Sequence, residues 1–154
     1  MTTTSDLDTL TDSEPPPQPV PDPDSLGYWE AMTRGQLSIR RCQDCGHWCH
    51  PPLERCRLCG GPTDYEPVSG MGTLYSFITI HQPAVPGYRD TVPYLVGLID
   101  LDEQTGLRIA ARIEDATAAD LRAGQPMQSR LVPHPGGDFW VPRFRPAPEA
   151  GTSE

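Results

Sequence analysis

The chain of 154 residues contains no lysine, and all twelve of its basic residues are arginine. It also lacks any run of about 18 apolar residues, which a membrane-spanning helix requires. Its first residues include neither the basic start nor the apolar stretch of a secretory signal peptide. We therefore expect a cytoplasmic protein that does not contact a membrane.

Apolar residues are few as well. They make up 36% of the chain, which is low for a protein that is folded throughout. The shortfall lies at the ends, because residues 1–23 are nearly all Thr, Ser, Asp and Pro and cannot bury enough apolar surface to offset the entropy of ordering them. We expect residues 1–23 to be a disordered, acidic, proline-rich tail and residues 146–154 to be a second tail. The folded units would then be residues 24–67 and 68–145.

All five cysteines lie between positions 42 and 59. Four of them form two C-x-x-C pairs, each followed by a glycine: Cys42, Cys45 and Gly46, then Cys56, Cys59 and Gly60. Two such turns can bring four thiolates to the corners of a tetrahedron at about 2.3 Å from a zinc ion. Each glycine allows the positive φ that turns backbone N–H groups towards sulfur. Disulfides are disfavoured by the odd number of cysteines and the absence of a secretion signal. The pattern predicts a structural zinc ribbon.

Cys49, His47 and His50 remain after this assignment. One of them could serve as a further ligand or reactive group, since the spacing of Cys45 and Cys49 also suits a metal. Alternatively, all three are side chains of the connecting loop. The second interpretation is favoured because the two glycine-backed pairs already complete a four-thiolate shell.

The residues before the ribbon predict a short helix over 25–34. Leu26, Trp29 and Met32 have helical spacing, and Gly35 ends the pattern. The alternating QLSIRR that follows predicts a strand leading into the first cysteine. Trp29 would pack either on the chain's own ribbon or on a partner surface.

Strand patterns follow after Pro67. Five runs rich in Val, Ile, Leu and aromatic residues are each bounded by Gly, Pro or Asp: GTLYSFITIH, PYLVGLIDL, LRIAARI, MQSRLV and DFWVPRF. Between the third and fourth runs, Thr117 and Asp120 have the spacing of a capping box, and Gly124 ends the turn. Five strands with one helix after the third is the order of an OB-fold barrel. The expected fold is therefore mainly β, with a short N-terminal helix, a zinc ribbon and a five-stranded OB-fold barrel.

Zinc ribbons and OB-folds both occur in nucleic-acid-binding proteins, so the charge of the barrel matters. Binding a phosphate backbone needs a basic groove with exposed aromatic side chains. Residues 68–154 carry ten acidic against seven basic side chains. This balance argues against a nucleic-acid partner.

The whole ordered series of motifs resembles the acyl-CoA-associated family of rubredoxin-like zinc ribbons fused to OB-folds. The series comprises a helix, C-x-x-C-G, a Pro-Pro pair at 51–52, a second C-x-x-C-G, GTLYSF, HQPAVPGY, VPYLVGLIDL and the closing VPRFRP. The resemblance covers residues 25 to 146. The chain departs from the family at Leu53 and Arg57, where the family commonly has Arg and Pro, and we expect this to affect only the loop surface.

The resemblance implies a non-catalytic, zinc-binding subunit of a thiolase-superfamily acyl-CoA enzyme complex. Relatives of this kind pair with thiolases, with lipid-transfer-protein-like aldolases that shorten steroid side chains, and with acyltransferase complexes. They stabilise the partner and help to form the acyl-CoA site. We favour an aldolase or thiolase of lipid or steroid breakdown. Catalytic residues would belong to the partner, because His81 and His134 have no Cys, Ser or carboxylate spaced as a catalytic set.

The loop HQPAVPGYRD carries the most specific expectation about a ligand. Its prolines stiffen it, and His81, Gln82, Tyr88 and Arg89 offer hydrogen-bond donors and a ring face for a CoA nucleotide or the partner. Arg89 would be the phosphate contact. The alternative is a solvated surface loop.

The last strand offers a second candidate interface. Trp140 and Phe144 alternate there with Arg143 and Arg145, and Trp with Arg is the composition of interface hot spots. Alternatively, Trp140 plugs the mouth of the barrel.

Two other functions remain open. A stand-alone OB-fold module would bind CoA esters or single-stranded nucleic acid by itself. A zinc-dependent enzyme is disfavoured, because catalysis needs an open metal position and a closed four-thiolate shell has none.

Overall fold

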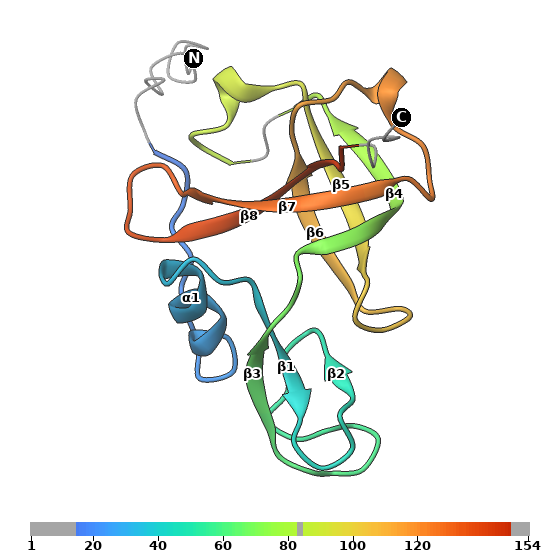
Figure 1. Cartoon of the computed structure of the whole chain (residues 1–154). Helices are drawn as coiled ribbons and strands as arrows, with labels where there is room; N and C mark the ends of the chain where they lie inside the picture. Colours follow the sequence, from blue (N-terminus) through green and yellow to red (C-terminus); the bar gives the residue numbers. More distant parts are fainter. Residues whose placement is uncertain (1–14, 83–84, 149–154) are drawn as a thin grey trace, which may run out of the picture.

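The computed structural model describes residues 15–82 and 85–148. The chain forms a helix and a small three-stranded sheet, followed by a closed five-stranded barrel (Figure 1). The small sheet lies below the barrel in Figure 1, and the helix lies beside it. The mainly β fold expected from the sequence is confirmed.

The helix α1 spans Leu26–Thr33, within the range predicted for it. It ends where predicted, because Gly35 adopts φ +79°, a conformation that glycine reaches without steric cost. The N–H groups of Gly35 and Gln36 donate to the carbonyls of Met32 and Ala31 at 2.9 and 3.0 Å. Ala31 and Met32 are buried, so this face of the helix packs on the rest of the protein.

The small sheet contains β1 (Ser38–Cys42), β2 (Trp48–Cys49) and β3 (Thr63–Pro67), in the order β2-β1-β3. Both neighbours pair with β1 in the antiparallel sense. The central strand therefore delivers the first C-x-x-C pair to one end of the sheet.

The barrel comprises β4 (Met71–Ile80), β5 (Tyr94–Leu101), β6 (Arg108–Ile113), β7 (Pro126–Pro133) and β8 (Trp140–Pro146). It closes in the order β4-β5-β6-β8-β7, and the β6–β8 pair is the parallel one. This is the five-stranded OB-fold that the sequence predicts.

Two short 3-10 turns complete the barrel: η1 (Arg89–Thr91) and η2 (Ala118–Asp120). The turn η2 begins with the predicted capping box. The N–H and hydroxyl of Thr117 both donate to the Asp120 carboxylate, at 2.8 and 2.6 Å. The segment is shorter than the helix suggested by the sequence.

The barrel interior is filled by one set of buried apolar side chains: Leu74, Leu95, Ile99, Leu101, Leu107, Ile109, Ala111, Ile113, Leu121, Met127 and Phe144. On β5 and β6 the odd-numbered residues are the buried ones, which is the period-2 alternation of a half-buried strand. The even-numbered residues of these two strands point away from the core.

The helix and the small sheet share this core with the barrel. Met32, Leu37, Ile39 and Trp48 belong to the same hydrophobic cluster as the barrel residues. The far end of the ribbon is different, because its buried cluster consists of Cys42, Cys49 and Cys56 alone.

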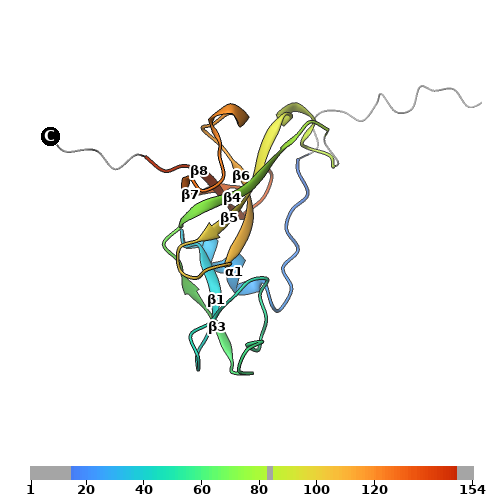
Figure 2. The ribbon, with the colours of Figure 1, turned by 90° about the vertical axis from the view of Figure 1, so that its right-hand side faces the viewer.

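The described part of the expected N-terminal tail, residues 15–23, contacts the barrel. Figure 2 shows this segment running from the barrel end of the molecule to α1. Gln18 Nε2 donates to the carbonyl of Pro135 at 2.8 Å, and Pro16 is buried. Composition alone did not indicate this packing. A proline-rich stretch can nevertheless lie on a surface at a small further cost in conformational entropy, because its backbone is already restricted.

None of the helices within the described residues has both the length and the apolar character needed to span a membrane.

Candidate metal centre and neighbouring surfaces

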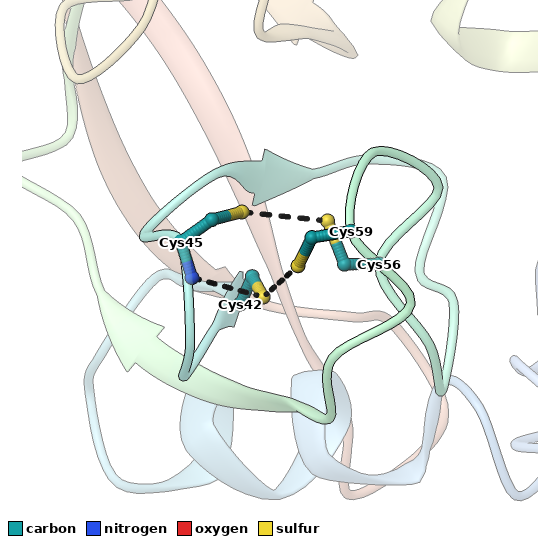
Figure 3. Close-up of side chains that lie close together, drawn as sticks. All are labelled: Cys42, Cys45, Cys56 and Cys59. Carbon is teal, nitrogen blue, oxygen red and sulfur yellow. Dashed lines mark hydrogen bonds between the residues drawn. The ribbon is translucent and has the colours of Figure 1, made fainter.

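The four cysteines of the two C-x-x-C pairs converge at the end of the ribbon (Figure 3). Their sulfur atoms all lie within 4.8 Å of one another. Cys42 Sγ is 3.4 Å from Cys59 Sγ, and Cys45 Sγ is 3.7 Å from Cys56 Sγ. A tetrahedron with zinc–sulfur bonds of about 2.3 Å has sulfur–sulfur edges of about 3.8 Å. All five cysteines are free thiols, so the cluster fits a tetrahedral metal ion.

The two halves of this cluster have the same backbone geometry. Gly46 and Gly60 each adopt φ +75°. Their N–H groups donate to the carbonyls of Cys42 and Cys56, at 3.0 and 2.8 Å. The positive φ expected after each pair is thus present, and it closes each C-x-x-C segment into a tight turn.

Other backbone N–H groups point at the sulfur atoms. The N–H of Cys45 donates to Cys42 Sγ at 3.5 Å, and the N–H of Leu58 donates to Cys56 Sγ at 3.4 Å. Hydrogen bonds from Cys59 and Leu58 lower the pKa of the Cys56 thiol to about 6. Donors of this kind stabilise the thiolate, which is the form that binds metal.

Cys49 does not belong to the four-sulfur cluster. It is buried beside Cys42 and Cys56, and its Sγ lies 3.8 Å from the carbonyl of His47. His50 is half-buried, and burial lowers its pKa. These residues occupy the connecting segment between the two C-x-x-C turns.

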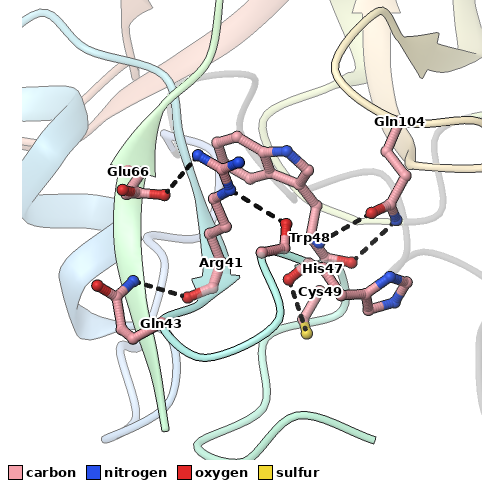
Figure 4. A network of polar contacts seen from close by, with 8 residues as sticks. Arg41, Gln43, His47, Trp48, Cys49, Glu66 and Gln104 are labelled. Atoms are coloured by element: carbon pink, nitrogen blue, oxygen red, sulfur yellow. Dashed lines mark hydrogen bonds and ion pairs between the residues drawn. The ribbon is translucent and has the colours of Figure 1, made fainter. Parts of the chain in front are cut away.

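A glutamine links the ribbon to the barrel (Figure 4). Gln104, in the β5–β6 turn, accepts from the N–H of Trp48 at 2.9 Å and donates to the carbonyl of Trp48 at 3.1 Å. The guanidinium of Arg41 lies over the Trp48 ring, 5.0 Å from its centroid, and pairs with Glu66 at 3.4 Å. Sequence analysis missed Gln104, because a polar residue in a turn carries no local signal of a contact 56 positions away.

Three of the four residues expected to contact CoA are open to solvent. His81, Gln82 and Arg89 are exposed, whereas Tyr88 is half-buried. The ring of Tyr88 lies 5.9 Å from that of Tyr94.

Tyr88 borders a cleft of about 470 Å³ between the barrel and the N-terminal segment. Its walls are mostly aromatic, aliphatic or proline residues: Pro16, Pro19, Trp29, Tyr88, Tyr94, Val96, Pro135, Val141 and Pro142. Two arginines, Arg112 and Arg143, stand side by side in this wall on paired positions of β6 and β8. The cleft therefore combines ring faces with positive charge. Arg143 was considered for an interface from the sequence, whereas Arg112 was not.

The three aromatic residues considered for an interface have different environments. Trp29 packs edge-on against Tyr28 and Phe139, at 5.1 and 5.5 Å between ring centroids, so it lies against the chain itself. Trp140 is 39% exposed and does not plug the barrel. The interface hypothesis is wrong for Phe144, which is 0% exposed and lies in the core.

His134 is buried at the β7–β8 hairpin. Its ring Nδ1 lies 3.2 Å from the amide of Gln18 and 3.1 Å from the carbonyl of Pro135. Neither group is an acid, a base or a nucleophile, so these contacts do not form a catalytic set.

Two family models match consecutive parts of the chain. Residues 29–66 match the rubredoxin-like zinc ribbon domain of ChsH2, and residues 65–132 match the C-terminal OB-fold domain of ChsH2.

Two curated proteins are similar over most of this chain. One is the 3-oxo-4,17-pregnadiene-20-carboxyl-CoA hydratase alpha subunit of Mycobacterium tuberculosis, 30% identical over 119 residues. The other is a probable enoyl-CoA hydratase alpha subunit of Thermomonospora curvata, 32% identical over 133 residues. The alignments cover 77% and 85% of this chain but only 37% and 40% of those proteins.

Two solved structures share the fold. The Ltp2–ChsH2 (DUF35) aldolase matches with a TM-score of 0.75 and 29% identity, over 84% of this chain and 98% of that chain. A DUF35-family protein of unknown function from Sulfolobus solfataricus matches with a TM-score of 0.54 and 13% identity, over 81% of this chain and 86% of that chain. The second likeness concerns the fold alone.

Proposed function

Because the chain belongs to the ChsH2-type family of rubredoxin-like zinc ribbons joined to OB-folds, we propose that it is a non-catalytic subunit of a thiolase-superfamily enzyme that acts on acyl-CoA. Within that class we favour an aldolase that cleaves a carbon–carbon bond in a steroid or lipid side chain. The observation that carries this proposal is the match to the Ltp2–ChsH2 aldolase, which extends over 98% of the matched chain.

We further propose that Cys42, Cys45, Cys56 and Cys59 hold a structural zinc ion. The short distances between their sulfur atoms and the N–H donors around them support this assignment. Zinc bound by four thiolates supplies folding free energy and has no open position for a substrate. The ribbon then serves to present a surface, and the chemistry takes place elsewhere.

The catalytic residues of the complex are assigned to the partner. In the described part of this chain, His134 contacts only an amide and a carbonyl, and His81 is exposed on a loop. Thiolase-superfamily chemistry needs a nucleophile or base held in position by a second group. The partner would supply that set.

The acyl-CoA contact is proposed for the loop between β4 and β5. Tyr88 would offer its ring from the wall of the cleft, and Arg89 would meet a phosphate at its rim. His81 and Gln82 would contribute hydrogen bonds at the start of the same loop. An Arg89→Ala variant is expected to raise the KM of the complex for acyl-CoA while its zinc content stays unchanged. An unchanged KM would remove Arg89 from the site.

The subunit hypothesis is tested by affinity purification of the tagged chain from its native host, with mass spectrometry of co-eluting proteins and zinc analysis. The expected result is one thiolase-superfamily protein in fixed ratio to the chain, with one zinc per chain. Elution of the zinc-loaded chain alone would contradict the proposal. In that case the stand-alone module becomes the better account, and calorimetric titration of the chain with CoA esters would test it directly.

A further inference from the structure

The outward face of β4, β5 and β6 is more apolar than a solvated barrel face. In an antiparallel sheet with one face in the core, the other face is usually polar. Here the outward positions include four apolar side chains that are aligned across the strands. Ser76 of β4 pairs with Leu98 of β5, and Leu98 pairs with Ala110 of β6. In the next row, Ile78 pairs with Val96.

Three of these side chains are open to solvent, whereas Val96 is half-buried at the edge of the cleft. Ile78 is 60% exposed and Leu98 is 37% exposed, and Ala110 is also exposed. Tyr75, at a bulge between Leu74 and Ser76, points outward as well and is 52% exposed. We name the set Tyr75, Ile78, Val96, Leu98 and Ala110 the outer strip. Contiguous exposed apolar patches of this kind mark interaction sites.

Two arginine–tyrosine stacks lie beside the outer strip. The guanidinium of Arg108 is 3.5 Å from the centroid of the Tyr75 ring and pairs with Asp100 at 2.7 Å. The guanidinium of Arg112 is 4.6 Å from the centroid of the Tyr94 ring. Tyrosine and arginine are enriched at binding hot spots, and side chains that are already held in place lose little entropy on binding.

The two arginines differ in charge balance. Arg108 is neutralised by Asp100, whereas Arg112 forms no ion pair with any acidic side chain in the described residues 15–82 and 85–148. Arg143 lies opposite Arg112 in the β6–β8 pairing, is itself cationic and forms an ion pair with Glu114 at 3.4 Å. The face therefore carries one positive charge without a counter-ion, on a chain whose net charge is −9.

An open strand edge borders the same strip. Strand β4 pairs with β7 only over Met71–Thr73, whereas residues 76–80 pair on one side with β5. Within the described part of the chain, no strand pairs with the other side of residues 76–80. An exposed edge of this type is a site where another chain can add contacts.

We propose that the outer strip is the docking surface for the thiolase-superfamily partner, with apolar partner side chains against Ile78 and Leu98 and a partner carboxylate against Arg112. This proposal rests on the proposed function. A second copy of this chain is a poorer occupant, because a two-fold contact between identical strips would bring no free carboxylate to Arg112. Asp100, the acid on β5 beside the strip, is already held by Arg108.

The test uses the thiolase-superfamily protein that co-purifies with the wild-type chain, and measures its Kd for full-length zinc-loaded variants by biolayer interferometry. Ile78→Asp and Leu98→Asp are each expected to weaken binding by about 30-fold or more, which is the hot-spot range. Arg112→Ala is expected to weaken it by about tenfold and to reduce its dependence on salt.

Leu53→Asp is the matched control, because Leu53 is 42% exposed on the ribbon and lies outside both C-x-x-C turns and outside the strip. It should change the Kd by less than about twofold. Thermal unfolding and zinc content of each variant report whether it is folded.

Each remaining outcome overturns a different claim. If the wild type binds the partner but the Ile78 and Leu98 variants bind equally well, the docking surface is wrong and the subunit hypothesis stands. If the wild type recovers no thiolase-superfamily partner, the proposed function itself fails. If the wild type alone sediments as a dimer that Ile78→Asp dissociates, the strip binds a second copy instead.

Discussion

The ribbon and the barrel are held together by different means. The barrel encloses Leu74, Ile99, Met127 and Phe144, all with 2% or less of their surface exposed. The end of the ribbon buries only cysteines. A segment with so small a core does not offset the entropy of ordering its backbone without a further cross-link. The barrel thus folds through its hydrophobic core, whereas we propose that the ribbon end depends on its four thiolates and a bound metal ion.

This difference assigns the two regions different tasks. The barrel presents wide sheet faces whose shape is set by packing, and one of them carries the outer strip. The ribbon adds a compact projection whose position relative to the barrel is set by Trp48 and Gln104. Zinc in the proposed site would be structural, because four thiolates leave no open position.

The largest expected effect separates the four cluster cysteines from Cys49. Cys42→Ser or Cys59→Ser should abolish stoichiometric zinc binding and unfold the ribbon end, because a structural zinc site contributes about 10–16 kcal/mol. Zinc content by mass spectrometry and amide hydrogen exchange in the ribbon check this. Cys49→Ser is the control and should keep both properties. Zinc loss in that variant would show that the metal shell includes Cys49.

The next effect addresses the barrel. Phe144→Ala removes a ring that is 0% exposed, so the barrel should lose about 3–5 kcal/mol of stability. The free energy of unfolding from urea titration measures the loss, and zinc content should stay at one per chain. Loss of zinc together with barrel stability would contradict the separation of the two regions.

A smaller effect concerns the link between them. Gln104→Ala leaves the N–H and carbonyl of Trp48 without their partner, at a cost of about 1–3 kcal/mol. Amide hydrogen exchange should quicken at Trp48 and its neighbours in β2, while the barrel core keeps its protection. Gln82→Ala is the control, because it removes the side chain of an exposed glutamine elsewhere in the chain. Equal protection of β2 in both variants would show that Gln104 does not fix the ribbon.

The smallest effect is a pH dependence at His50. Because burial lowers the pKa of His50, the neutral imidazole stabilises the fold above its unfolded pKa of about 6.5. This contribution is lost as the pH falls through the lower folded pKa. Wild-type Tm should therefore fall more between pH 7.5 and 5.5 than that of His50→Gln, provided that the zinc content is unchanged. His81→Gln, on an exposed loop, is the control. Parallel curves for wild type and His50→Gln would contradict the role of burial.

Local patterns were sufficient to predict much of this architecture. The helix start and stop, the two C-x-x-C-G turns and the period-2 strands depend on neighbours in the sequence, and each is present in the structure. The Thr117–Asp120 capping box is another local feature that the sequence indicated correctly.

Features that depend on strand register or on distant contacts could not be predicted in the same way. The pairing that places Ile78 beside Val96, and Val96 beside Arg112, follows from a bulge and from barrel closure. The packing of Gln18 on the β7–β8 hairpin joins segments 117 positions apart. Alternation predicted a shared face for Trp140 and Phe144 of β8, but the burial of this strand does not alternate regularly, and of the two only Phe144 lies in the core.

The most direct test of the account is reconstitution of the partner's acyl-CoA cleavage reaction from purified subunits. Turnover is measured for the thiolase-superfamily subunit alone, for this chain alone and for the two together, each with zinc quantified. We expect turnover by the mixture and none by this chain. Turnover by the isolated chain would contradict the account.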